Sequence, residues 1–129
     1  MLLGFKRQFA KYVEEGSKTH TIRAVRKITP KVGEVCHCYV DPRQKSMRLL
    51  GRFRCTRVSD IEICRMHTAL AVFIDGEVLS CDEAESLFQR DGFRAEGSAA
   101  ITQAAKFWKG KLPFKGHLIH WKYEKGAGL

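Results

Sequence analysis

The stretch MRLLGRFRCTRVSDIEI, residues 47–63, decides the fold, because it is the longest segment of the chain that fits a single extended strand. Within it Arg52 and Arg54 flank Phe53, and this alternation of polar and apolar side chains is typical of a strand with one buried face. We therefore expect both arginines to face solvent and the phenylalanine to pack. Gly51 interrupts the alternation, and a glycine in a strand often marks a bulge, so the sequence predicts one long or bent strand.

Shorter elements surround this strand. Phe9 and Val13 recur at helical spacing before Gly16, which predicts a helix that ends at this glycine. Ser80 and Glu83 have the S-x-x-E spacing of a capping box at a helix start. The predicted strands are 2–5, 19–25, 34–40 and 117–123, the Asp75–Gly76 pair predicts a hairpin, and the predicted helices are 6–15, 81–90 and 98–109. This order of elements predicts an α+β domain with a mainly antiparallel, curled sheet.

The length and charge of the chain limit what it can be. A chain of 129 residues fits a single domain, residues 1–129, with its own hydrophobic core. The final segment EKGAGL is typical of a frayed end, so we expect a flexible tail from about residue 124. The chain carries 23 Lys and Arg against 14 Asp and Glu, a net charge of +9. This excess favours a polyanionic partner such as nucleic acid, although a basic surface can also serve only solubility.

The cysteines indicate neither disulfides nor a metal centre. They stand at positions 36, 38, 55, 64 and 81 and contain no C-x-x-C pair. Because a zinc site needs about four ligands, usually as two pairs, we expect no metal site and instead small buried thiols in a reducing cytosol. No segment approaches the roughly 20 apolar residues of a membrane span, and MLLGFKRQF lacks the apolar core of a leader peptide. We therefore predict a cytoplasmic protein with no membrane partner.

The segment GSKTHTIR, residues 16–23, has an unusual density of polar side chains for a strand. On extended backbone Thr21 and Arg23 share one face, while His20 and Ile22 share the other. We expect Ile22 to enter the core with His20 near the core's edge. The first face then presents a hydroxyl beside a guanidinium.

Lys18 precedes this strand in a turn that Gly16 permits, so its amine can point at the same spot. A lysine, a hydroxyl and an arginine that converge on one cleft suit a phosphate or a polarised carbonyl. Basic residues at the start of a strand are also commonly just solvated. The residues alone leave both interpretations open.

Several motifs in order resemble the signature of the ASCH family. The pattern G-x-K-x-x-T-x-R begins at Gly16, a P-x-x-G-E turn follows at 30–34, and Asp91-Gly92-Phe93 precedes a helix that carries Phe107-Trp108. The resemblance runs from about Phe5 to Tyr123, nearly the whole chain. It implies a PUA-like β-barrel with flanking helices and a function in RNA binding or RNA chemistry.

One branch of that family consists of small amidohydrolases that deacetylate N4-acetylcytidine without a cofactor. By motif, their catalytic residues correspond to Lys18, Thr21 and Asp91. The resemblance implies a threonine that attacks or holds the substrate, a neutral lysine that takes its proton, and a carboxylate that relays the proton to the leaving amine. This chain departs from the pattern in three places: it has Asp91 in place of glutamate, an insertion within 94–116, and His20 in place of an apolar residue.

A second branch is similar to metal-dependent ribonucleases acting on single-stranded RNA, for which a divalent ion such as Mn²⁺ or Mg²⁺ is implied. Tyr12 and Lys18 match that branch by spacing, and Ser98 is the candidate for its serine. Tyr12 also lies on the apolar face of the predicted helix, so core packing is an alternative role for it.

Basic and aromatic residues elsewhere could bind an RNA strand, because phosphates pair with cations and bases stack on rings. The candidates are Arg26, Lys27, Arg52, Arg54, Lys106, Lys109, Lys111 and Phe114. We expect Phe114 to be an exposed platform in a loop, Trp108 to lie in the core, and Phe93 to wall the cleft or form a structural corner.

The leading hypothesis is an RNA-interacting ASCH domain whose cleft, lined by Lys18, Thr21, Arg23 and Asp91, binds a nucleotide or modified base. The alternatives are a hydrolase, either amidohydrolase or ribonuclease, and a non-catalytic adaptor that binds RNA or a protein. The oligomeric state stays open.

Overall fold

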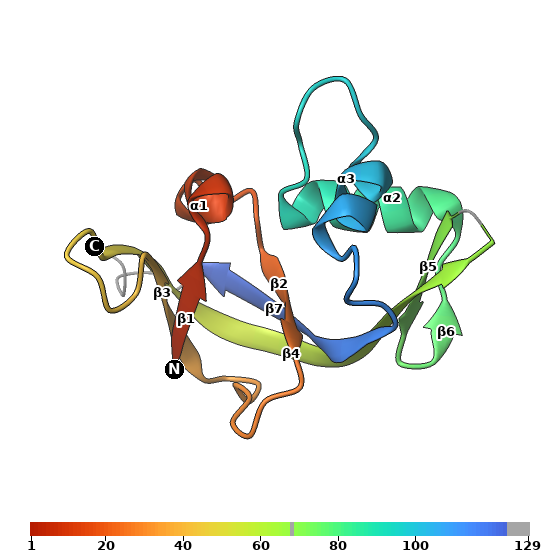
Figure 1. The fold of residues 1–129 in the computed structure, drawn as a ribbon. Helices are drawn as coiled ribbons and strands as arrows, with labels where there is room; N and C mark the ends of the chain where they lie inside the picture. The colour runs from red at the N-terminus through yellow and green to blue at the C-terminus, as the bar shows by residue number, and fades with distance from the viewer. Residues whose placement is uncertain (68, 124–129) are drawn as a thin grey trace.

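The computed structural model describes residues 1–67 and 69–123. In these residues three helices pack against one large sheet, whose curvature is visible in Figure 1. The strands are β1 (Leu2–Phe5), β2 (His20–Ala24), β3 (Val35–Val40), β4 (Arg48–Met66), β5 (Ala69–Ile74), β6 (Glu77–Val78) and β7 (Phe114–Tyr123), and the helices are α1 (Arg7–Glu14), α2 (Cys81–Asp91) and α3 (Ala100–Phe107). The predicted tail from residue 124 lies outside the described residues.

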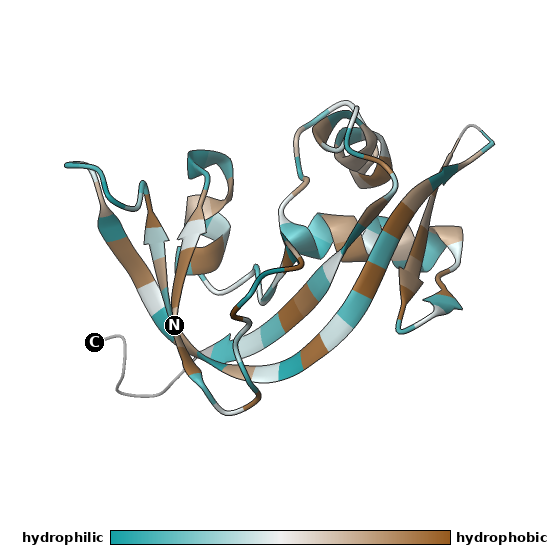
Figure 2. Ribbon diagram, turned by 60° about the horizontal axis from the view of Figure 1, so that its bottom comes forward, coloured by the Kyte–Doolittle hydropathy of each residue, from teal (hydrophilic) through white to brown (hydrophobic). Residues whose placement is uncertain are grey.

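The long strand β4 organises the sheet, as its sequence predicts. Its first part pairs with β3 and its last part with β5, while β7 pairs with residues 53–63 and therefore lies along the opposite edge. Beyond β7 comes β2, and beyond β3 comes β1. In Figure 2 hydrophobic and hydrophilic residues alternate along the two longest strands. The α+β class and the curled sheet with flanking helices are confirmed, but β1 and β3 are parallel and the sheet is not closed into a barrel.

The bulge expected at Gly51 is confirmed. Cys38 pairs with Gly51 but Tyr39 pairs with Leu49, so Leu50 has no partner in the β3–β4 ladder. Phe53 packs in the core as predicted, with 3% of its surface exposed. Arg52 and Arg54, expected to face solvent, are half-buried and have partners.

The helix ends follow their local sequence. Ser80 and Glu83 form the predicted capping box, since the Ser80 hydroxyl accepts from the Glu83 amide and the Glu83 carboxylate accepts from the Ser80 amide. Gly92 ends α2 in the left-handed region at φ +114°. The Glu85 carboxylate accepts from the first amides of α3, both at 2.9 Å, and so caps a helix whose own N-cap residue is an alanine.

The close approach of α1 to the end of α2 places the polar residues described next. A Cβ at position 92 would lie 2.6 Å from the Phe9 ring, so a side chain there would force the two helices apart. Phe9, Phe88 and Phe93 pack edge to face beneath this contact. The last residue of α2, Asp91, is thereby held against the start of β2.

Candidate functional site

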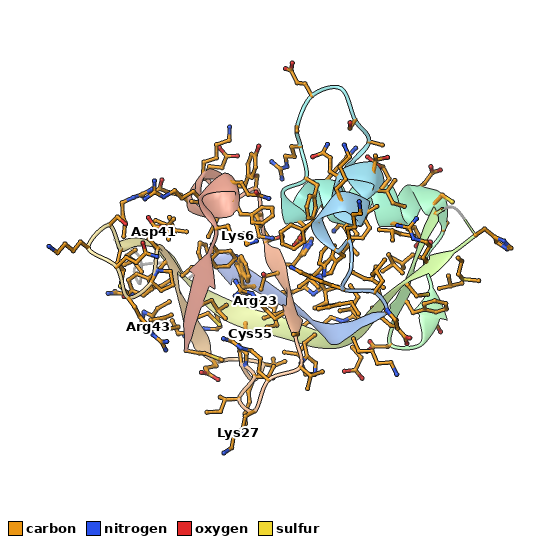
Figure 3. The ribbon with its side chains drawn as sticks, viewed as in Figure 1. Lys6, Arg23, Lys27, Asp41, Arg43 and Cys55 are labelled. Atoms are coloured by element: carbon orange, nitrogen blue, oxygen red, sulfur yellow. The ribbon has the colours of Figure 1, made fainter. Side chains whose placement is uncertain are left out.

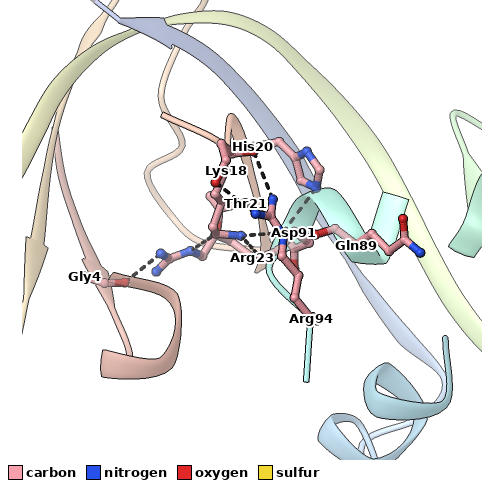
Figure 4. A network of polar contacts seen from close by, with 9 residues as sticks. Gly4, Lys18, His20, Thr21, Arg23, Gln89, Asp91 and Arg94 are labelled. Atoms are coloured by element: carbon pink, nitrogen blue, oxygen red, sulfur yellow. Dashed lines mark hydrogen bonds and ion pairs between the residues drawn. The ribbon is translucent and has the colours of Figure 1, made fainter. Parts of the chain in front are cut away.

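A cleft of about 210 Å³ opens between α1, β2 and α3. Its walls are aromatic and one end is polar. The aromatic residues are Phe5, Phe9, Phe93, Phe107 and Trp108, and the polar end is formed by Lys18, Thr21, Arg23 and Asp91. Figure 4 shows these four polar side chains converging from the start of β2 and the end of α2. The structure thus brings together all four residues of the leading hypothesis and places Phe93 in the wall.

Lys18 and Asp91 form a buried ion pair at the polar end. Lys18 is 2% exposed, and its Nζ donates to the Asp91 carboxylate oxygen Oδ1 and to the Asp91 backbone oxygen, both at 2.6 Å. Burial lowers the pKa of Lys18, against the opposing effect of the Asp91 charge. Burial also acts to raise the pKa of Asp91, but Lys18 and His20 outweigh it and the pKa lies below its usual value. Two of the three ammonium hydrogens are engaged, which leaves one for a ligand.

Arg23 fixes the hydroxyl of Thr21. Its Nε donates to Thr21 Oγ1 at 3.0 Å, and its terminal nitrogen donates to the Gly4 carbonyl at 2.6 Å. The guanidinium also lies over the Phe5 ring, 4.7 Å from its centroid. Because Thr21 Oγ1 accepts from Arg23, its own hydrogen can be donated to a ligand in the cleft.

Arg94 stabilises the site from outside the cleft, a role that no motif or periodicity predicts. Its guanidinium donates to the Gln89 carbonyl at 2.8 Å and to the hydroxyl and carbonyl oxygens of Ser17, the residue before Lys18. It also lies 4.4 Å from the centroid of the Tyr12 ring. Arg94 therefore ties the end of α2 to the turn that carries Lys18.

His20 is completely buried, whereas we expected it at the edge of the core with Ile22 inside. Ile22 is half-buried and lines the cleft instead. The reason is that α2 covers the His20 face of β2 and supplies a carboxylate there, with His20 Nε2 3.3 Å from Asp91 Oδ1. On the neighbouring strand His120 pairs directly with His20, their ring centroids 5.5 Å apart.

His120 is expected to make the protein acid-sensitive. Burial, followed by the charges of His20, Arg57 and Arg90, lowers its pKa to about 4 from an ordinary 6.5. The unfolded chain therefore binds the proton more readily, and stability is lost as pH falls from 6.5 to 4. For this half-buried ring we expect a loss of about 1–2 kcal/mol after solvent screening. Urea denaturation at pH 7 and pH 4.5 should show a smaller loss for His120→Gln than for wild type; equal losses would contradict the assignment.

The residues implied by the ribonuclease resemblance do not meet in the cleft. Tyr12 is half-exposed and stacks on Arg94 outside it. Ser98 is exposed and lines a separate hollow with Glu85 and Gln103. Asp91 is the single carboxylate among the described residues that line the cleft, and it is engaged by Lys18. These side chains do not fit a divalent-ion site, because such an ion takes several oxygen ligands.

The predicted phosphate-binding residues lie in three regions. Arg26 and Lys27 are exposed just after β2, and Lys106, Lys109 and Lys111 are exposed around the end of α3, with Lys111 Nζ 5.4 Å from the Phe107 centroid. Arg52 and Arg54 lie on β4. The prediction that Phe114 is an exposed loop residue is wrong. Phe114 begins β7 and pairs with Ile63, and its half-buried ring packs on Trp108. Trp108 lies in the core and also walls the cleft.

Three of the five cysteines, Cys36, Cys38 and Cys55, are buried free thiols as predicted, whereas Cys64 is half-buried and Cys81 is exposed. Burial raises the pKa of Cys36 to about 11 and that of Cys38 to about 12, so neither ionises near neutral pH. Within residues 1–67 and 69–123 no three His, Cys, Asp or Glu side chains are grouped to hold a metal ion. None of the described helices is both long and apolar enough to cross a membrane.

Comparison with known proteins identifies the fold. No protein-family model and no curated protein matches this sequence. A solved structure that does match is that of ZmASCH from Zymomonas mobilis, a serine-to-alanine mutant. It superposes with a TM-score of 0.53 at 16% identity, over 94% of this chain and 66% of the other, so this chain spans just under two thirds of that protein's length. At this identity the likeness shows the fold alone: the chain has the ASCH, PUA-like fold that its motifs imply.

Proposed function

We propose that this chain, an ASCH-like fold with an aromatic cleft, binds RNA by taking one nucleobase into that cleft. The observation that carries the proposal is the convergence of Lys18, Thr21 and Asp91 at one end of a space walled by rings. Its volume of about 210 Å³ is below the roughly 300–1,000 Å³ typical of pockets for drug-sized ligands, so it suits a planar base better than a whole nucleotide.

The polar end has the hydrogen-bonding groups that a base edge needs. Lys18 keeps one ammonium hydrogen and Thr21 one hydroxyl hydrogen for carbonyl or ring-nitrogen acceptors on the base. Phe93 and Trp108 supply faces for stacking, which stabilises a bound base by about 1–3 kcal/mol per stacked base in single-strand binding proteins. The net charge of +9 favours RNA over a free, neutral nucleoside as the natural ligand.

A second candidate is hydrolysis of an N4-acetylated cytosine, which the ASCH amidohydrolases carry out. One observation favours it: burial lowers the pKa of Lys18, which lies three residues before Thr21 and lines the same cleft, and this brings a neutral amine closer to working pH. Thr21 Oγ1 would attack the acetyl carbon while Lys18 takes the hydroxyl proton, the cytosine amine would leave with a proton, and water would then hydrolyse the acetyl ester on Thr21. Lys18 must first leave its ion pair with Asp91, which is why base binding is the leading proposal.

Fluorescence of Trp108 tests the proposal directly, in a Trp121→Phe background that removes the second tryptophan. Titration with cytidine, uridine, adenosine and an eight-nucleotide single-stranded RNA should give saturable quenching for at least one nucleoside and for the RNA. Thr21→Val should weaken nucleoside binding about 10-fold, the value of one hydrogen bond worth about 1.5 kcal/mol.

The hydrolase and adaptor alternatives are separated by two further outcomes. Chromatography of N4-acetylcytidine after incubation should show conversion to cytidine with wild type and none with Thr21→Val if the hydrolase candidate holds. Saturable RNA binding without any quenching of Trp108 would instead contradict the base-binding proposal and favour an adaptor that contacts RNA outside the cleft.

A further inference from the structure

A second hollow of about 510 Å³ adjoins the cleft. Gly4, Phe5, Lys6 and Arg23 line both spaces, so the two are adjacent and share these residues as a common wall. We refer to the second hollow, completed by residues 41–44 and Arg26, as the β1 groove. Figure 3 shows Lys6, Arg23 and Arg43 around β1, with Lys27 pointing away on the loop beyond. A strand that places one base in the cleft therefore reaches the β1 groove with its neighbouring nucleotides.

The β1 groove is cationic. Lys6, Arg23, Arg26 and Arg43 line it, and Asp41 is the one carboxylate among its described lining residues. That carboxylate is already neutralised, because Arg7 donates to it at 2.8 Å and the Ser46 hydroxyl at 2.9 Å. The arginines of the groove are thus available to an anionic ligand that Asp41 does not repel.

The backbone holds Arg43 at the groove against its own preference. Asp41 and Arg43 have φ values of +50° and +64°, in the left-handed region that is unfavourable for residues other than glycine. The loop is also pressed onto β1: a Cβ at Gly4 would lie 2.6 Å from Pro42 Cγ. Glycine at position 43 would suit this backbone better, and such strained residues are common at binding sites.

We propose that the β1 groove binds the sugar-phosphate backbone of nucleotides flanking the base in the cleft, so that the ligand is a single-stranded RNA segment. The inference rests on the proposed function, since the base in the cleft fixes where the strand begins. Arg23, which lines both spaces, lies where the base meets its own phosphate. A single strand is favoured over a duplex, because a base must leave its stack to enter the aromatic cleft.

The test compares RNA with nucleoside binding in matched variants. Arg43→Gly removes the guanidinium but fits the left-handed backbone, and Arg26→Ser removes a second cation. The control is Arg65→Ser, which removes the same charge from the exposed far end of β4. Anisotropy of a labelled eight-nucleotide single-stranded RNA across a salt series gives affinity and salt dependence, and Trp108 quenching gives nucleoside affinity.

Arg43→Gly and Arg26→Ser should each lower RNA affinity about 5- to 10-fold and reduce the salt slope by about 0.7, the value for one lost phosphate contact on a single strand. Both variants should keep the nucleoside affinity of wild type, and Arg65→Ser should leave RNA affinity and the salt slope unchanged. Arg43→Gly should be at least as stable as wild type. If Arg43→Gly and Arg26→Ser bind RNA as tightly as Arg65→Ser does, the proposed role of the β1 groove is wrong, while the proposed base site is unaffected. Absence of nucleoside binding would overturn both proposals, and equal binding of poly-glutamate would overturn RNA as the ligand.

Discussion

Asp91→Ala is expected to destabilise the protein by about 3 kcal/mol at pH 7, near the lower end of the range for breaking a buried ion pair. The variant leaves the Lys18 ammonium, 2% exposed, without its carboxylate. The loss stays near the lower end because Lys18 Nζ keeps its 2.6 Å bond to the backbone carbonyl of residue 91. His20 loses the same acceptor, so the cost falls on two buried side chains.

The pH dependence of this variant has a definite sign. Removing Asp91 removes the charge that raises the pKa of Lys18, so the pKa falls further below 10.5. The folded state then binds fewer protons than the unfolded chain, and stability rises with pH up to about the unfolded value of 10.4. Urea denaturation at pH 6, 7.5 and 9 should therefore show the deficit shrinking as pH rises. Asp82→Ala, on the exposed first turn of α2, is the control and should lower the free energy of unfolding by less than about 1 kcal/mol. An equally small decrease for Asp91→Ala would contradict the role of the buried ion pair in stability.

Local patterns in the sequence predicted most of the elements. Alternation identified β4 with its bulge at Gly51, and the capping box at Ser80 fixed the start of α2. The Asp75–Gly76 turn joins β5 to β6 with φ values of +49° and +84°. Each of these signals depends on residues within a few positions of one another, which is why they could be recognised without knowledge of the tertiary structure.

The errors involve contacts between distant parts of the chain. Lys18 and Asp91 are 73 positions apart, and their meeting was expected only from the family motif. His20 is polar by hydropathy, and only its contact with Asp91 at the end of α2 explains its burial. Phe114 looked exposed because its neighbours are polar or break secondary structure, but pairing with β4 turns its ring onto Trp108. The role of Arg94 depends on packing that no periodicity reveals.

Replacing both members of the ion pair should separate stability from binding. In Lys18→Met/Asp91→Leu both charges of the buried pair are removed, and apolar replacements of buried ion pairs are often neutral or stabilising. We expect the double variant to recover about 2 kcal/mol of the roughly 3 kcal/mol lost in Asp91→Ala. The recovery is incomplete because His20 still lacks its acceptor. Urea denaturation of wild type, Lys18→Met, Asp91→Leu and the double variant gives the coupling energy as a thermodynamic cycle.

The same double variant should bind nucleosides about 10- to 100-fold more weakly, since a charge-assisted hydrogen bond from Lys18 is worth about 1.5–3 kcal/mol. The aromatic walls from Phe9 to Trp108 stay in place, so Trp108 fluorescence remains a valid measure of binding. A folded double variant with wild-type nucleoside affinity would mean that the pair only holds α2 against β2, and the cleft would lose its polar recognition group. A folded double variant that no longer binds nucleosides would show that the Lys18 charge serves ligand recognition, because the protein would be shown to fold without it.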